Sequence, residues 1–259
     1  MFKLIKFEFA RKKMVFAVAA ALTVLGQLYA LYNYFKIDET IRGGIGDDVF
    51  AIFVGVVLVA FAILYFIDII FLFRNDLFKQ EGYMLFMTPH NGYKLLGSKL
   101  IFALIEGLCI ALIYIAIVYF NAQIMHMGPI DFDLTGINGE IIKTMIKGLV
   151  LGVFGILEFA LTVYLSFALF KSLFNNTRFK GLITFGIFVL INIVKSKIVS
   201  VIADLMGQTF SNVAINANSG DMMIETVNTA LNYGLVASIV SAVILFIGTG
   251  YLLENRINL

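Results

Sequence analysis

RNDLFKQEGYMLFMTPHNGYKLLGSK, residues 74 to 99, is the stretch that decides how this chain is organised. It is the longest internal segment rich in polar and charged residues, and strongly apolar runs lie on both sides of it. An apolar run of about 20 residues crosses the hydrocarbon core of a bilayer as a helix. Charged side chains are costly there, so this segment belongs in water. The pattern predicts an aqueous loop between two membrane spans.

The composition of the whole chain agrees with a membrane location. Of 259 residues 61% are hydrophobic, and only 14% are charged, where a soluble domain has about 25%. A soluble core of this length cannot hide so many apolar side chains, whereas lipid accepts them on every face of a helix. We therefore predict an all-α polytopic membrane protein, with one transmembrane domain over residues 1 to 259.

Six apolar runs are long enough to span a bilayer. Their approximate bounds are 14–35, 49–73, 100–120, 149–170, 181–202 and 231–253. The run 181–202 is the weakest because it contains Asn192 and ends near Lys195 and Lys197; without it the count is five. The first run follows a basic N-terminus but has no cleavage-site pattern, so we expect it to be retained as a span.

The first 13 residues carry five basic side chains among several phenylalanines. They predict an interfacial helix that leads into the first span, or else a basic tail that only sets orientation. With six spans, thirteen of the nineteen Lys and Arg residues fall on the side of the N-terminus. By the positive-inside rule this side, with both termini and residues 74–99, is cytoplasmic. Lys195 and Lys197 fit this distribution least well, and residues 203–230 become an outer segment that can form short helices.

Motifs for catalysis are missing from the sequence. A nucleotide-hydrolysing loop needs a Gly-Lys pair, and the chain contains none. His90 and His126 fall on opposite sides of the predicted membrane, so no metal site is expected. The single cysteine, Cys109, lies in an apolar run and predicts no intramolecular disulfide. We predict no catalytic residues, no bound cofactor and no nucleic-acid partner.

Three acids lie inside apolar runs: Asp68, Glu106 and Glu158. A charge at mid-bilayer costs about 3 kcal/mol on the lenient insertion scale, so such residues usually face protein, water or a basic partner. They are candidates for a translocation path or for proton transfer. The alternative is that they are neutral, or hydrogen-bonded between helices, and serve packing.

Small residues recur at the start of the fourth run, at Gly148, Gly152 and Gly155. This spacing lets another helix approach closely. The contact is either with another subunit or with a helix of the same chain.

Residues 74–99 resemble the first cytoplasmic loop of ABC-2-type exporter permeases, a bacterial family. The resemblance is carried by Glu81-Gly82, Thr88-Pro89 and Ser98-Lys99, and extends loosely to the basic N-terminus and the six spans. It implies that the loop holds a coupling helix seated in a separate ATPase subunit, that two ATPases bind ATP and Mg, and that two permease copies, or this chain and a paralogue, form the path. It also implies a location in the bacterial plasma membrane.

Pro89 ends a helix sharply and disfavours helical backbone at Thr88, so the preceding residues can present a short rigid face. The predicted ATPase-coupling residues are Asp76, Leu77, Lys79, Glu81, Gly82, Met84, Leu85, Thr88 and Pro89. The alternative for this segment is an interfacial helix that lies on lipid.

The function predicted from this resemblance is the permease subunit of an ATP-driven exporter, which is not an enzyme by itself. Its cargo is expected to be a peptide, an antimicrobial or another amphiphile. Two alternatives remain open: a proton-coupled secondary transporter that uses the intramembrane acids, and a membrane scaffold or sensor that transports nothing.

Overall fold

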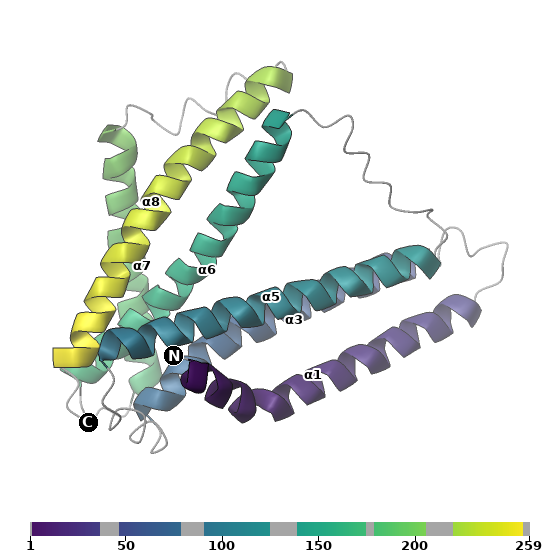
Figure 1. Cartoon of the computed structure of the whole chain (residues 1–259), viewed down its shortest axis with the longest axis horizontal. Coiled ribbons are helices and arrows are strands. Elements are labelled where there is room, and N and C mark those ends of the chain that lie inside the picture. The colour runs from purple at the N-terminus through teal and green to yellow at the C-terminus, as the bar shows by residue number, and fades with distance from the viewer. Residues whose placement is uncertain are drawn as a thin grey trace. The chain divides into compact units, whose positions relative to one another are not determined.

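The computed structural model describes residues 2–36, 47–78, 91–124, 139–174, 179–205 and 220–255. Over these ranges the chain is helical and contains no strand (Figure 1). The helices are α1 (Phe2–Lys36), α3 (Asp47–Phe78), α5 (Gly92–Ile124), α6 (Gly139–Leu173), α7 (Lys180–Leu205) and α8 (Gly220–Asn255). Each of these six is long and apolar enough to cross a membrane. The all-helical, multi-pass architecture is therefore confirmed for the described residues.

Each predicted apolar run lies within one helix, but the helices are longer than the runs. The weakest run is part of α7, a helix of spanning length, which favours six spans over five. The expected outer segment 203–230 is helical up to Leu205 and again from Gly220. Hydropathy marks only the part of a helix that lipid can cover, whereas backbone hydrogen bonding continues into the polar residues at either end.

The predicted interfacial segment at the N-terminus is the first part of α1, and no break separates it from the span. Figure 1 shows that α1 bends near its start. Lys12 is buried although it lies in the basic segment. This residue therefore packs against other helices.

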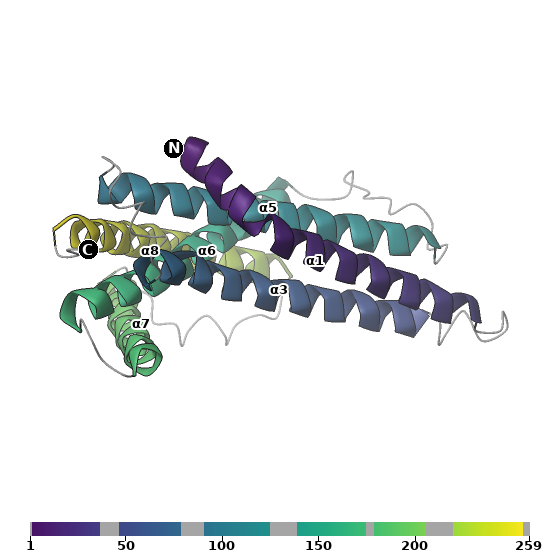
Figure 2. The ribbon, with the colours of Figure 1, turned by 90° about the horizontal axis from the view of Figure 1, so that it is seen from below.

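The chain divides into two compact units. The first contains Met1–Ile69 and Ile101–Phe132, and the second contains Ile70–Leu100 and Asp133–Leu259. In the first unit, α1 lies beside the larger parts of α3 and α5 (Figures 1 and 2). A small core there is formed by Ala30 and Tyr34 of α1, with Phe53 of α3 packed against it.

The second unit has an aromatic core between the last turns of α3 and the second half of α6. The ring of Phe73 stacks on that of Tyr164 at a centroid distance of 4.4 Å, and both side chains are fully buried. Phe78 lies beside Phe167 and Phe170 of α6, at 6.0 and 5.9 Å. Helix α6 also contacts α7 and α8. These contacts fasten the end of α3 to α6.

The start of α5 meets the end of α8 at two glycines. A Cβ atom on Gly250 would overlap the ring of Tyr93, and one on Gly92 would lie 2.9 Å from the Cβ of Leu253. The ring of Tyr93 also lies beside that of Phe246 on α8, with a centroid distance of 5.9 Å. The close approach of the two helices therefore depends on the absence of side chains at these positions.

We predict that Gly250→Ala destabilises the protein, because the added methyl group displaces the Tyr93 ring. Overpacking of this kind costs about 1–3 kcal/mol. Gly248→Ala, two residues earlier, is the matched control, since its Cβ would lie 3.8 Å from the nearest atom, in Leu165. Thermal unfolding of the purified variants in detergent measures the difference. Equal melting temperatures for the two variants would contradict the close approach.

Candidate functional site

Two of the predicted intramembrane acids are brought together by a lysine. Lys12 of α1 forms ion pairs with Asp68 of α3 and Glu106 of α5, and its Nζ lies 3.1 Å from Glu106 Oε2. The same ammonium lies 4.6 Å from the centre of the Phe102 ring, an additional favourable contact. All of these residues belong to the first unit. We call Lys12, Asp68 and Glu106 the Lys12 cluster.

A tyrosine next to the Lys12 cluster joins α3, which carries Asp68, to α5, which carries Glu106. Tyr65, one turn before Asp68, donates a hydrogen bond of 2.9 Å from its hydroxyl to the carbonyl of Ala103. A Cβ on Gly107 would come within 2.8 Å of the Tyr65 hydroxyl oxygen, so the glycine makes room for it. Because Ala103 and Gly107 lie on either side of Glu106 in α5, these contacts set the register in which the two carboxylates face one lysine.

The electrostatics of the Lys12 cluster are unusual for a membrane helix. Lys12 and Glu106 are buried, and taking an ion out of water costs several kcal/mol unless it is paired. One ammonium faces two carboxylates. The cluster can therefore hold the three helices together and can bind a further positive charge.

Glu158, the third predicted acid, is paired in the second unit. Lys195 Nζ of α7 lies 3.5 Å from Glu158 Oε2 of α6. The hydropathy pattern placed Lys195 near the end of the weakest apolar run, on the outer side of the membrane, and in the structure it lies inside α7. Its misfit in the charge distribution is explained, because its charge compensates an acid within the helices.

A further ion pair lies where α3 ends and α5 begins. Lys99 of α5 binds Asp76 of α3, and both side chains are buried, with exposed fractions of 1% and 2%. Next to Lys99, the Ser98 hydroxyl donates to the carbonyl of Leu95 at 2.7 Å. The pair belongs to the second unit, where it joins the two helix ends that flank residues 79–90.

Two of the nine predicted ATPase-coupling residues are described by the structure. Asp76 and Leu77 lie in the last turn of α3, and both are buried within the chain. They are placed to hold α3 against its neighbours. The other seven lie outside the described residues: Lys79, Glu81, Gly82, Met84, Leu85, Thr88 and Pro89.

The predicted subunit-packing glycines lie on an open part of α6. A Cβ on Gly148, Gly152 or Gly155 would meet no atom within 4 Å among the described residues. The alternative in which these glycines serve a close contact inside the chain therefore has no support from the described helices. A contact with another subunit stays a prediction.

Other polar contacts between helices gave no recognisable signal in the sequence. Gln27 of α1 and the buried Asn121 of α5 are hydrogen-bonded at 2.6 Å. Lys147 of α6 donates to Asn228 of α8 at 2.5 Å. The intramembrane acids in the sequence indicate that basic partners are needed. Lys12 could be identified as such a partner only by knowing which face of α1 is turned inward.

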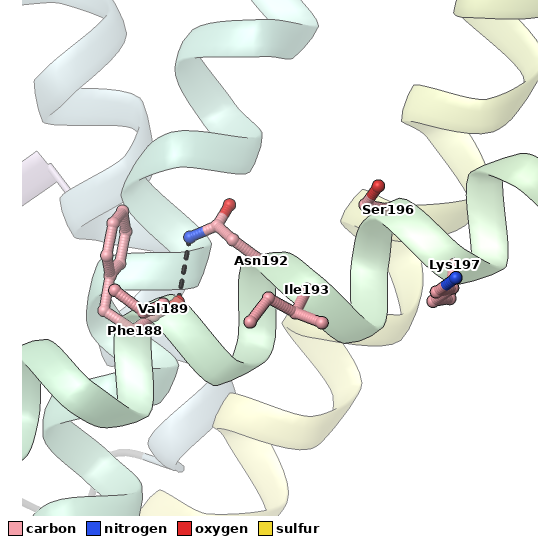
Figure 3. Close-up of a pocket in the computed structure, with 6 residues that line it drawn as sticks. All are labelled: Phe188, Val189, Asn192, Ile193, Ser196 and Lys197. Carbon is pink, nitrogen blue, oxygen red and sulfur yellow. Dashed lines mark hydrogen bonds between the residues drawn. The ribbon is translucent and has the colours of Figure 1, made fainter.

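A shallow pocket lies on α7 (Figure 3), and all six side chains that line it come from that helix. Asn192 donates from its side-chain nitrogen to the carbonyl of Phe188, at 2.9 Å, within the same helix. With no lining residue from a second helix, the pocket does not bring converging groups onto a ligand.

Among the described residues, no group of three or more His, Cys, Asp or Glu side chains is arranged to hold a metal ion. No family model, curated protein or solved structure matches the chain.

We predict that Lys99→Met destabilises the protein strongly, because it removes the Lys99 ammonium from the buried carboxylate of Asp76. Removing one partner of a buried ion pair costs about 3–5 kcal/mol. Lys94→Met is the matched control, since Lys94 lies on the same helix and is exposed. Thermal unfolding, or unfolding in sodium dodecyl sulfate, checks the prediction. Stability of the Lys99 variant equal to that of the control would contradict the role of the pair.

Proposed function

We propose that this chain is the permease subunit of an ATP-driven exporter of the ABC-2 type. Three observations support the proposal: six helices long enough to span a membrane, no sequence for a nucleotide-binding loop, and the resemblance of residues 74–99 to the coupling loop of that family. The energy for transport then enters from a separate ATPase that binds ATP and Mg. Two ATPase subunits and a second permease, identical or paralogous, complete the transporter.

The observation that carries the proposal is the way in which residues 79–90 are attached to the helices. On one side, Phe78 ends α3 and contacts Phe167 and Phe170 of α6. On the other side, Tyr93 begins α5 and contacts Phe246 of α8. The Asp76–Lys99 pair links the two sides, so the helix ends that flank the segment are held to each other and to α6 and α8.

This attachment is suited to mechanical coupling. Interdigitated side chains transmit a displacement because a packed core does not deform continuously. In the proposed mechanism, closing of the ATPases pushes on residues 79–90, and α6 and α8 of the second unit tilt with the ends of α3 and α5. Asp76 and Leu77 serve as internal anchors, while Lys79, Glu81, Gly82, Met84, Leu85, Thr88 and Pro89 face the ATPase.

The proposed location follows from the same assignment. Residues 79–90 and both termini lie in the cytoplasm of a bacterial cell, and the chain spans the plasma membrane. The cargo is a peptide, an antimicrobial or another amphiphile, since the helices carry apolar side chains and small polar ones such as Ser238 and Ser241.

We predict that this chain co-purifies with an ATPase containing a Gly-x-x-x-x-Gly-Lys-Ser/Thr loop, and that Leu85→Glu reduces the retained ATPase at least tenfold. A charge placed in an apolar groove is left without a partner and costs more than the 1.4 kcal/mol that corresponds to this factor. Glu81→Lys should lower cargo transport per ATP hydrolysed. Lys143→Glu, an exposed charge reversal at the start of α6, is the control and should change neither quantity.

Retention of the ATPase and coupling of transport to hydrolysis that are unchanged in both variants would contradict the placement of the ATPase contact.

The second candidate function is a proton-coupled secondary transporter, favoured by the Lys12 cluster. Transport into vesicles that is driven by a pH gradient without nucleotide, in a preparation free of ATPase, would replace the exporter proposal with that one.

A further inference from the structure

The ionic contacts inside the helices differ in their ratio of lysines to acids. Glu158 faces one lysine, Lys195, at 3.5 Å. In the Lys12 cluster, the single ammonium of Lys12 is shared by Asp68 and Glu106. With every group ionised, the Glu158–Lys195 pair is neutral, whereas the Lys12 cluster carries one negative charge in excess.

Most of the Lys12 cluster is shielded from its surroundings by the helices. Lys12 and Glu106 are buried among apolar side chains, and the Lys12 ammonium lies over the ring of Phe102. A buried carboxyl group without its own counter-charge becomes neutral by taking up a proton. We propose that the Lys12 cluster is a proton-binding site, in which Asp68 and Glu106 together hold one proton at neutral pH.

Burial indicates which acid carries this proton. The side chain of Glu106 is 4% exposed and that of Asp68 is 21% exposed. Desolvation penalises the ionised form most where burial is greatest. Glu106 is therefore the acid that holds the proton, while Asp68 shares the Lys12 ammonium with it.

Among the described residues, the ionisable neighbours of the Lys12 cluster are a charge pair and a tyrosine hydroxyl. On α1, Glu8 lies one turn before Lys12 and is paired with Arg11, whose guanidinium is 2.7 Å away. On α3, the Tyr65 hydroxyl donates to the carbonyl of Ala103. On α5, the buried neighbour of Lys12 is the uncharged Phe102. The site thus consists of one lysine and two acids from three helices, and it does not depend on the exporter assignment.

Infrared spectroscopy of the purified full-length protein in lipid nanodiscs tests the proposal, because a protonated carboxyl group has a C=O band separate from those of carboxylates, and the band shifts in D2O. The wild type should show one such buried group. Glu106→Gln should remove its band. Asp68→Asn should also remove it, since Glu106 then becomes the only acid facing Lys12 and ionises.

Removing a lysine should increase the band of protonated carboxyl groups, whereas removing an acid of the Lys12 cluster should abolish it. Lys12→Met should add a second protonated carboxyl, giving about twice the wild-type band area, because both acids then lack a counter-charge. Lys195→Met should create a new band from Glu158, and Glu158→Gln, the matched control, should leave the wild-type band unchanged.

Absence of the band from the wild type, or its persistence in Glu106→Gln, would overturn the proposal. Glu106→Gln preserves the shape and neutrality of the protonated side chain, so it decides the matter even if Asp68→Asn or Lys12→Met does not accumulate as folded protein. The wild type could also lack the band at neutral pH and depend on sodium ions for its stability. That result would assign the positive charge in the Lys12 cluster to a metal cation and would equally overturn the proposal.

Discussion

The contact between a buried lysine and a buried carboxylate is the interaction on which this structure most depends. Helices that are apolar on nearly every side find little preference for one packing over another in lipid, because lipid tails are as apolar as their side chains. An ionised group changes this, since it must meet its counter-charge or lose its charge. Lys12, Lys99 and Lys195 each select the helix that carries their acid. The charges are few, but they decide which faces turn inward.

A buried ion pair also determines how a force on residues 79–90 would reach the helices. The Asp76–Lys99 pair lies at the ends of α3 and α5 that flank residues 79–90, and aromatic contacts fasten those ends to α6 and α8. A loop attached by flexible ends would absorb a push from a partner protein. When the helix ends that flank a loop are joined by a buried ion pair and by ring contacts, they pass that push on to the helices packed against them. The proposed use of a separate ATPase follows from this attachment and from the missing nucleotide-binding loop.

The sequence predicted the helices well and the pairs between them poorly. Apolar runs of spanning length identify each described helix, because lipid leaves a strong composition signal. The same runs place the acids Asp68, Glu106 and Glu158 inside the membrane and predict that they need partners. They do not reveal the partners, since Lys12 belongs to the basic N-terminal segment and Lys195 to the polar end of the weakest run. Which lysine meets which acid depends on helix rotation and on register over long sequence separations, and hydropathy contains neither. The helices also extend past the apolar runs, as at Asp76 and Leu77, because backbone hydrogen bonding continues beyond the apolar residues.

A buried charge pair, rather than the shape of the side chains at those positions, holds the end of α3 to the start of α5 at the proposed coupling end. Exchanging the charges tests it most directly. The unfolding free energy is measured for Asp76→Lys, for Lys99→Glu and for the double variant. We expect each single reversal to destabilise by at least the 3–5 kcal/mol that is typical of a broken buried pair, and the double variant to recover more than half of the summed loss, since opposite charges face each other again. A double variant whose loss equals the sum of the two single losses would contradict the account.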